Sequence, residues 1–174
     1  EIIGKTPIRN VIAVSPGDAL GAALPSPPVD ARLQANGAPV SFAQALEIGK
    51  AKRRVPVALT GADTLFLQYT GGTTGLSKGA TLSHRNLIAN TEQFKAMMPD
   101  AMRPGVEVIV TAIPLYYIFA LMVNFITYFS VGADNWLVPN PRDFEAFIET
   151  FKKARPSVFM GVNTLYAGLV AHPK

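Results

Sequence analysis

The sequence has no cysteine and only two histidines, His84 and His172, among its 174 residues. Without cysteine the chain forms neither a disulfide bond nor a thiolate metal site, and two histidines are too few for a histidine-rich site. We therefore expect no metal ion bound by the protein's own side chains. The lack of cysteine is compatible with a reducing compartment, and we expect a cytoplasmic location.

Charge is also scarce, since charged residues make up 16% of the chain and apolar residues 49%. This composition excludes a disordered chain and predicts a domain with a buried core. The basic residues are spread out apart from one cluster, Lys50, Lys52, Arg53 and Arg54. A short cluster of this kind is typical of a solvated helix end, so we expect no nucleic-acid partner.

The N-terminus shows no signal-peptide pattern, and the chain begins with Glu1, so we expect a piece of a longer protein. From Val108 to Ala133 no residue is charged, which is long enough for a membrane span. Pro114 and Asn124 interrupt this run, and no Lys/Arg asymmetry flanks it. We favour a buried strand followed by a core helix, and a membrane span is the alternative.

The order of elements predicts an α/β fold: a layered, largely parallel sheet flanked by helices. Residues 1–40, rich in Pro and Gly, are predicted to be an entry and linker segment with one short strand. Residues 41–174 are predicted to form an α/β subdomain. Strands are predicted at Asn10–Val14, Thr64–Tyr69, Gly79–Leu82, Val106–Ile113, Asn135–Val138 and Ser157–Val162. Helices are predicted after the capping-box pattern Ser41/Gln44 and at Arg85–Met98, Tyr116–Phe129, Asp143–Ala154 and Thr164–Val170.

The stretch from Tyr69 to Ala80 contains the parts that a triphosphate-binding loop needs. Its glycines let backbone N–H groups converge on an anion, its threonines add hydroxyl donors, and Lys78 adds a positive charge. The spacing fits neither a Walker A loop nor a dinucleotide-binding pattern. A flexible glycine turn is the alternative, which the Lys-Gly pair and the flanking strands disfavour. The candidate phosphate-binding residues are Tyr69, Thr70, Gly71, Gly72, Thr73, Thr74, Gly75 and Lys78.

The loop resembles the signature phosphate loop of the adenylate-forming, or AMP-binding, superfamily. Leu82–Leu87 and Ile113–Leu121 resemble the next segments of that superfamily. Asn140–Asp143 and Gly161–Leu165 resemble bacterial long-chain fatty acid–CoA ligases in particular. The resemblance implies part of the large N-terminal domain of such an enzyme, which converts a carboxylate and ATP into acyl-AMP and pyrophosphate and then makes acyl-CoA.

The resemblance also implies roles and partners. Thr70, Thr73, Thr74 and Lys78 would hold the outer phosphates of ATP, with Mg²⁺ bridging them, and CoA would be the co-substrate. A fatty acid is the implied acyl substrate, and its lipid solubility suggests peripheral contact with the inner membrane face. An incomplete sheet exposes its edges, so homodimerisation is a further expectation.

The sequence departs from the family at Tyr117, on the acyl and carboxylate side, where a His is usual, and at Ser77, where Pro is common. Tyr117 is interpreted as a packed side chain with a polar tip, and altered acyl selectivity is the alternative. The family's later segments would lie beyond Lys174, so the isolated chain is expected to be inactive. A ligase for another carboxylate, and a non-catalytic nucleotide-binding or membrane-associated module, remain alternative functions. His84 is interpreted as a helix-start residue and Trp136 as a core residue.

Overall fold

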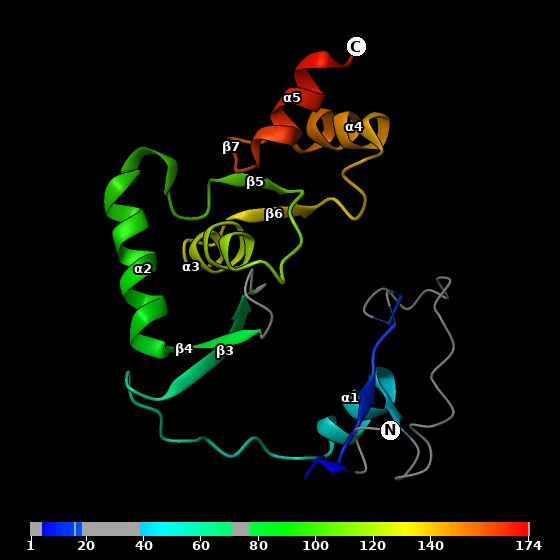
Figure 1. Ribbon diagram of the computed structural model, residues 1–174, viewed down its shortest axis with the longest axis vertical. Coiled ribbons are helices and arrows are strands. Elements are labelled where there is room, and N and C mark those ends of the chain that lie inside the picture. The colour runs from blue at the N-terminus through cyan, green and yellow to red at the C-terminus, as the bar shows by residue number, and fades with distance from the viewer. Residues whose placement is uncertain (1–4, 16, 19–38, 71–76, 174) are drawn as a thin grey trace. The chain divides into compact units, whose positions relative to one another are not determined.

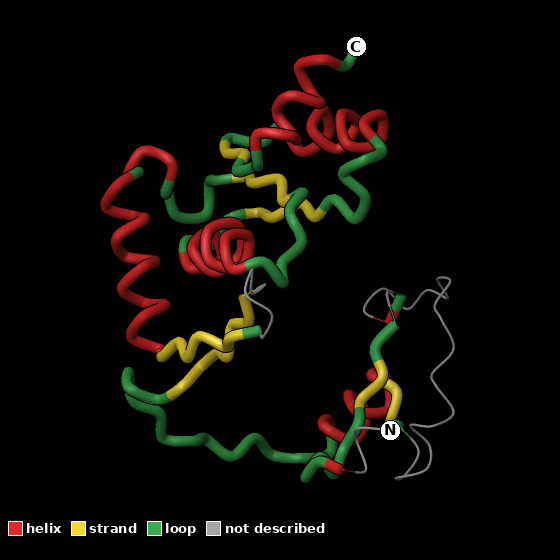
Figure 2. Tube along the Cα trace, viewed as in Figure 1, coloured by secondary structure: helices red, strands yellow, loops and turns green. Residues whose placement is uncertain are grey.

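The protein is described by a computed structural model that covers residues 5–15, 17–18, 39–70 and 77–173. These residues belong to two compact units, residues 1–58 and 59–174 (Figures 1 and 2). The predicted division at residue 40 remains a prediction. Most of the predicted linker lies outside the described residues.

The first unit contains a short parallel strand pair and one helix. Strand β1, Ile12–Ala13, pairs with β2, Val40–Ser41, and helix α1, Phe42–Lys50, follows at once. The predicted capping box is confirmed: the Gln44 N–H donates to Ser41 Oγ at 3.2 Å, and the Ser41 N–H donates to Gln44 Oε1 at 3.0 Å. These two bonds give partners to the backbone N–H groups of Ser41 and Gln44, and so stabilise the start of the helix at Phe42.

The second unit begins with an antiparallel hairpin, β3, Thr64–Thr70, and β4, Lys78–Ser83. Ser83 ends β4 and also caps α2, His84–Met97, through a capping box with Asn86. The predicted strand, return strand and helix are thereby confirmed. After the short helix η4, Pro99–Ala101, the chain enters the parallel sheet.

The parallel sheet has the order β6-β5-β7, with β5, Val108–Thr111, between β6, Asp134–Leu137, and β7, Val158–Phe159. Both pairings are parallel, which confirms the predicted sheet type. Strands β5 and β7 are shorter than their predicted runs, and β6 begins and ends one residue earlier than predicted. Their flanking residues, such as Ala112 and Ile113, stay buried without pairing to a neighbouring strand.

Helices cover both faces of this sheet. Successive side chains of β5 point to opposite faces, and each face buries them in its own core. Ile109 packs with Tyr128 and Val158 on the face that also includes Phe94 of α2. Val110 packs with Phe147 on the opposite face. That opposite face is covered by α4, Phe144–Ala154, and α5, Asn163–Ala171 (Figure 1).

The predicted amphipathic helix is confirmed in α4, which Asp143 caps by accepting from the Ala146 N–H at 3.1 Å. Phe147 is fully buried, whereas Glu145 and Lys153 are exposed. Helix α5 lies close to α4, because a Cβ added to Gly168 would come within 2.3 Å of Phe144 Cζ. A larger residue at position 168 would therefore require the Phe144 ring or the helices to shift.

The uncharged run contains the main departure from the predicted elements. The helix expected at Tyr116–Phe129 is a π-helix, η5, Ala120–Thr127, continued by α3, Tyr128–Ser130. In its wide turns the Thr127 hydroxyl donates to the carbonyl of Met122, five residues earlier, at 2.8 Å. Among the described residues, no helix has both the length and the hydropathy needed to cross a bilayer.

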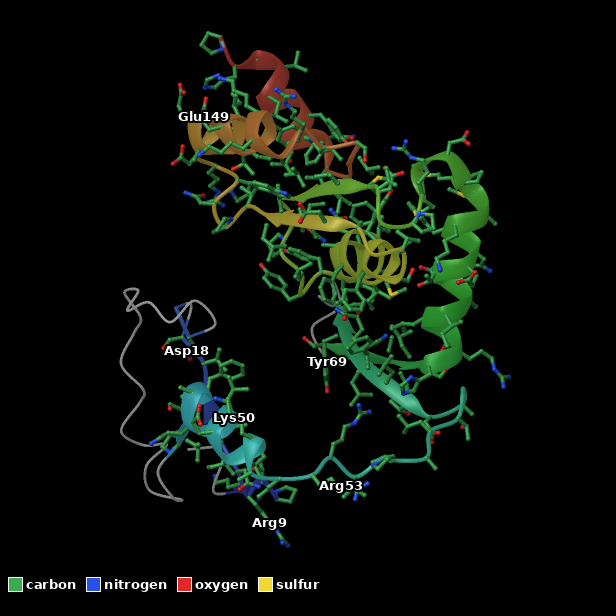
Figure 3. The ribbon with its side chains drawn as sticks, turned by 180° about the vertical axis from the view of Figure 1, so that it is seen from behind. Arg9, Asp18, Lys50, Arg53, Tyr69 and Glu149 are labelled. Carbon is green, nitrogen blue, oxygen red and sulfur yellow. The ribbon has the colours of Figure 1, made fainter. Side chains whose placement is uncertain are left out.

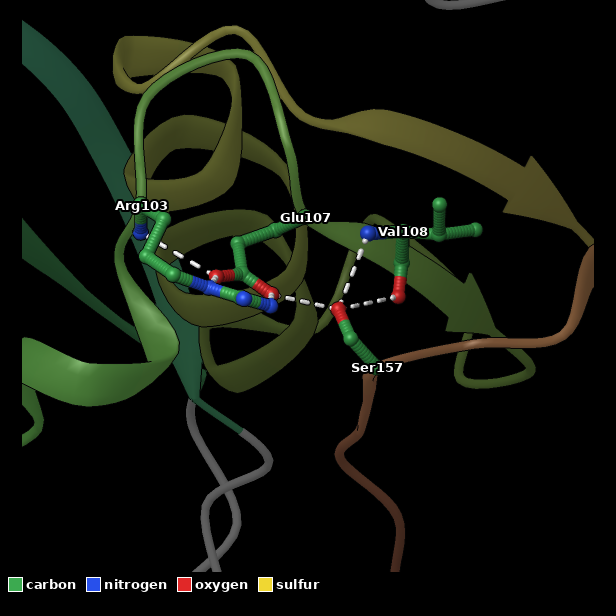
Figure 4. A network of polar contacts seen from close by, with 4 residues as sticks. All are labelled: Arg103, Glu107, Val108 and Ser157. Carbon is green, nitrogen blue, oxygen red and sulfur yellow. Dashed lines mark hydrogen bonds and ion pairs between the residues drawn. The ribbon is translucent and has the colours of Figure 1, made fainter.

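The buried carboxylate of Glu107 lies just before β5 and bonds to Ser157, just before β7 (Figure 4). Glu107 is 1% exposed and accepts from Arg103 Nε at 2.6 Å and from the Arg103 backbone N–H at 3.1 Å. It also accepts from the Ser157 hydroxyl, while the Ser157 N–H donates to the Val108 carbonyl at 2.9 Å. The Glu107 carbonyl accepts from the Asp134 N–H at 2.9 Å. These bonds lie beside the first residues of β5, β6 and β7.

The pKa values of two groups, Glu107 and the nearby Tyr128, are shifted in this region. The Arg103 and Ser157 hydrogen bonds lower the pKa of Glu107 from 4.5 to about 2. Burial raises the pKa of Tyr128 to about 12, and the negative charge of Glu107 adds to this effect. The ionised form of Glu107 is therefore the one that the fold stabilises.

Replacing Glu107 by Gln should destabilise the chain by about 2 kcal/mol at neutral pH, because a charge-assisted network is lost. A carboxylate whose folded-state pKa is lowered contributes stability above its unfolded value, near 4.5, and loses it as the pH falls through about 2. The stability gap between the parent and Glu107→Gln should therefore shrink as the pH falls from 6 to 2.5. Urea unfolding across this range measures the gap, and a constant gap would contradict the assignment.

Candidate functional site

The hairpin places two of the predicted phosphate-binding residues side by side. Thr70 ends β3, Lys78 begins β4, and the two are paired directly across the hairpin. Directly opposed side chains of an antiparallel pair lie on the same face. The Thr70 hydroxyl donates to the Lys78 carbonyl at 3.4 Å, and both side chains are exposed. The other predicted loop residues lie outside the described residues: Gly71, Gly72, Thr73, Thr74 and Gly75.

Tyr69 lies on the opposite face of the hairpin from Thr70, because side chains alternate along a strand. Its ring covers Gly79, where an added Cβ would lie 3.3 Å from Tyr69 Cζ. The structure therefore brings Thr70 and Lys78 together and turns the ring of Tyr69 away from them.

One contact connects the hairpin to the predicted acyl-side segment. Gln68, two residues before Thr70 and on the same face, donates from Nε2 to the Tyr116 carbonyl at 3.4 Å. The face that carries Thr70 and Lys78 is thus the face directed at Tyr116 and its neighbour Tyr117. The sequence analysis did not select Gln68, since the contact joins residues 48 positions apart.

Tyr117 lines an apolar cavity of about 740 Å³ at the carboxyl ends of the three parallel strands. In open α/β sheets this edge is where ligands bind. The loops after β5, β6 and β7 all contribute to it. The lining residues are Ala112, Ile113, Pro114, Tyr117, Ile118, Phe119, Pro141, Arg142, Phe144, Val162, Thr164 and Leu165.

Three segments that resemble the family therefore surround one cavity, although they lie far apart in the sequence. They are Ile113–Leu121, Asn140–Asp143 and Gly161–Leu165. Sequence reasoning selected Tyr117 from the first segment and missed Arg142 and Thr164 from the other two. The resemblance of those segments to fatty acid–CoA ligases was the signal that could have identified them.

The Tyr117 side chain is 54% exposed and contacts the ring of Tyr116, with the ring centroids 4.6 Å apart. The hydrogen bond with the Tyr117 side chain raises the pKa of Tyr116. The pair therefore places two hydroxyl groups close together, and Tyr117 brings its own to the lining of the cavity. The Leu121 N–H donates to the Tyr117 carbonyl at 2.9 Å, which ties this segment to the start of η5.

Buried polar side chains hold η5 against the sheet. The Thr111 hydroxyl donates to Asn135 Oδ1 at 2.8 Å, and Asn135 Nδ2 donates to the Asn124 carbonyl at 2.7 Å. Asn124 Nδ2 lies 3.4 Å from the Met160 carbonyl, next to the loop that follows β7. These bonds join β5, β6, η5 and the end of β7, and so position the helix that follows Tyr117.

Three other residues named from the sequence, His84, Trp136 and His172, lie at helix ends or pack against a core. His84 is the first residue of α2, as predicted, and Trp136 packs against the core that contains Phe147. His172 Nε2 lies 3.6 Å from Glu145 at the end of α5. Within the described ranges, no three His, Asp or Glu side chains are grouped so that they could hold a metal ion.

Comparison with known proteins identifies the family. A family model described as AMP-binding enzyme matches residues 6–174. The chain belongs to the AMP-binding enzyme family. It is 44% identical over 131 residues to a long-chain-fatty-acid–CoA ligase of Salmonella typhimurium, which covers 75% of this chain and 23% of that protein. It is also 37% identical over 178 residues to the ligase of the same name from Yersinia pestis, which covers 98% of this chain and 32% of that protein.

The fold of this AMP-binding chain is likewise similar to solved structures. The N-terminal domain of FACL13 from Mycobacterium tuberculosis matches 95% of this chain and 40% of that domain, with a TM-score of 0.69 and 19% identity. The predicted fold class and the resemblance to bacterial long-chain ligases are therefore confirmed. The chain spans about a quarter of the length of the Salmonella relative.

The cavity should bind an apolar probe, and partly filling the cavity should weaken that binding. Val162→Trp, at the cavity, should weaken binding of a fluorescent fatty-acid analogue by roughly tenfold, because the indole occupies the apolar volume. Val170→Trp is the matched control, since Val170 is an exposed valine of α5 outside the cavity lining. Fluorescence titration of the chain measures both, and equal weakening by the two variants would contradict the site.

Proposed function

We propose that this chain is part of an ATP-dependent long-chain fatty acid–CoA ligase. The proposed reaction joins a fatty acid carboxylate to the α-phosphate of ATP, releases pyrophosphate, and then transfers the acyl group to CoA. The observation that carries this proposal is the Gln68–Tyr116 contact. It directs the hairpin face with Thr70 and Lys78 toward the segment whose next residue, Tyr117, lines the apolar cavity.

The phosphate side of this site consists of donors and positive charge. The Thr70 hydroxyl and the Lys78 ammonium are exposed at the paired ends of the loop, where they are free to contact a polyphosphate. Such groups act by positioning the nucleotide and by neutralising the charge of departing pyrophosphate. In this proposal Thr73, Thr74 and the loop glycines complete the phosphate contacts.

Mg²⁺ enters the proposal as an ion carried by the nucleotide. The described residues offer no group of carboxylates or imidazoles that could hold a metal. Mg²⁺ takes few protein ligands and is commonly bound through substrate phosphates. The donor set here therefore fits a Mg²⁺–nucleotide complex, in which the ion would neutralise the phosphates and the hairpin would contact the complex from outside.

The acyl side of the site fits a long apolar acid. The cavity volume falls in the range of ligand pockets, and its lining is apolar apart from a few side chains such as Arg142 and Thr164. The Arg142 guanidinium is suited to a carboxylate or phosphate oxygen at the mouth of this cavity. The similarity to relatives named long-chain-fatty-acid–CoA ligase supports a long-chain substrate.

Replacing Lys78 by Ala in the full-length protein should slow adenylate formation by about a hundredfold, because one charged donor to the transition state is lost. Lys78→Arg should retain more activity, since it keeps the charge. Lys152→Ala is the matched control, because Lys152 is exposed on α4 and pairs with Glu149. ATP–pyrophosphate exchange with palmitate measures all three. Parent-like exchange by Lys78→Ala would contradict the proposed role of the loop.

Replacing Tyr117 by His should introduce a new pH dependence. Protonated His attracts a carboxylate, so the KM for the fatty acid should fall as the pH drops below about 6.5, the ordinary pKa of histidine. Tyr117→Phe should show no such change. Initial rates between pH 5.5 and 8, with hexanoate, palmitate and benzoate, measure the effect and the acyl preference together. The same KM–pH profile in both variants would place residue 117 away from the carboxylate.

A further inference from the structure

The hairpin of β3 and β4 is fixed to its surroundings at its base. The Asp63 carbonyl accepts from the His84 N–H at 3.1 Å, and the Gly61 carbonyl accepts from the Arg85 N–H at 2.9 Å. Both bonds join the residues before β3 to the start of α2. They hold the end of the hairpin that lies opposite the connection between the two strands, so the loop end depends on a contact of its own.

Gln68 supplies a contact close to the loop end. Its Nε2 donates to the Tyr116 carbonyl at 3.4 Å, and the residue is half-buried. Among the described residues, this is the hydrogen bond that joins the two strands to the segment before η5. Tyr69, the next residue along β3, marks this end of the hairpin in Figure 3.

The acceptor of this bond belongs to a turn whose own backbone is hydrogen-bonded. The Tyr117 N–H donates to the Pro114 carbonyl at 3.0 Å, and the Tyr117 carbonyl accepts from the Leu121 N–H at 2.9 Å. Pro114 and Tyr117 both line the apolar cavity. Gln68 therefore connects the hairpin to an ordered turn in the wall of the cavity.

The position of Gln68 along β3 makes this bond important for the phosphate side of the site. Gln68 lies two residues before Thr70 on the same face, and Thr70 pairs with Lys78. A strand rises by about 3.3 Å per residue, so Gln68 and Thr70 are about 7 Å apart along the strand. Loss of the Gln68 bond would therefore let Thr70 and Lys78 move relative to the cavity. In reactions between two bound groups, a misplacement of about 1 Å lowers the rate about a hundredfold.

We propose that Gln68 is a positioning residue for adenylate formation, an inference that rests on the proposed ligase function. Its bond to Tyr116 holds Thr70 and Lys78 at the distance from the cavity at which the fatty acid carboxylate can attack ATP. In that step a carboxylate oxygen forms a bond to the α-phosphorus. The bond from the α-phosphorus to the bridging oxygen breaks, and pyrophosphate leaves with its electron pair. Gln68 acts through the hairpin and touches neither reacting group.

This role concerns only the first half of the reaction. In the proposed function Thr70 and Lys78 hold the outer phosphates, which have left before the acyl group moves from the adenylate to CoA. Loss of the Gln68 bond should therefore slow adenylate formation and spare acyl transfer. A role in folding alone would instead lower both half-reactions by the same factor, because it would lower the amount of folded enzyme.

The test uses the full-length protein with Gln68→Met, which keeps the reach of the side chain and removes the donor. The kcat of palmitate-dependent ATP–pyrophosphate exchange should fall about thirtyfold, while the KM values for ATP and palmitate stay within about threefold of the parent. Acyl transfer from synthetic palmitoyl-AMP to CoA should stay within about twofold of the parent. Gln68→Asn keeps the donor but shortens its reach, and it should show the same selective loss.

Gln93→Met is the matched control, because Gln93 is an exposed glutamine of α2. It should retain parent rates in both half-reactions. Parent-like exchange by Gln68→Met and Gln68→Asn, or equal loss in the two half-reactions, would overturn the positioning role and leave the ligase function in place. A parent protein that forms no adenylate from ATP and a carboxylic acid would contradict the ligase function, and the inference with it.

Discussion

The carboxylate of Glu107 lies where the three parallel strands begin, and its bonds to Arg103 and Ser157 connect segments 50 residues apart. Parallel strands are not joined by tight turns, so their register has to come from such long-range contacts. Here Ser157 bonds both the side chain of Glu107 and the backbone of Val108, which aligns β7 with β5. The Asp134 N–H bonds the Glu107 carbonyl and aligns β6.

Alignment at the amino ends determines where the strands stop at the carboxyl ends. β5 and β6 end at the same paired position and β7 ends one position earlier, and the loops that follow the three strands line the cavity of Tyr117 and Arg142. The bonds of Asn135 and Asn124 add a second constraint, because they hold η5 onto the sheet behind this cavity. A buried ionic cluster thus lies at the amino ends of the strands, and a network of Thr111, Asn124 and Asn135 lies toward their carboxyl ends.

The sequence predicted those parts of the fold whose causes are local. The caps at Ser41, Ser83 and Asp143 begin helices because each side chain bonds a backbone group within three residues. The π-helix could not be predicted, because η5 is apolar nearly all round and leaves no periodic pattern from which to read its turn. The Gln68–Tyr116 contact and the burial of Glu107 could not be predicted either, since both depend on residues brought together only by the sheet and the hairpin. The site was therefore recognised by its motif before its geometry could be known.

The hairpin that carries Thr70 and Lys78 also limits how related sequences can vary in length. Side chains alternate along each strand, so one residue inserted between Gln68 and Thr70, or between Lys78 and Ala80, would turn the end of that strand to the opposite face. Such an insertion would separate the threonine from the lysine although every catalytic-type residue was still present. Length changes within these strands should therefore occur in twos.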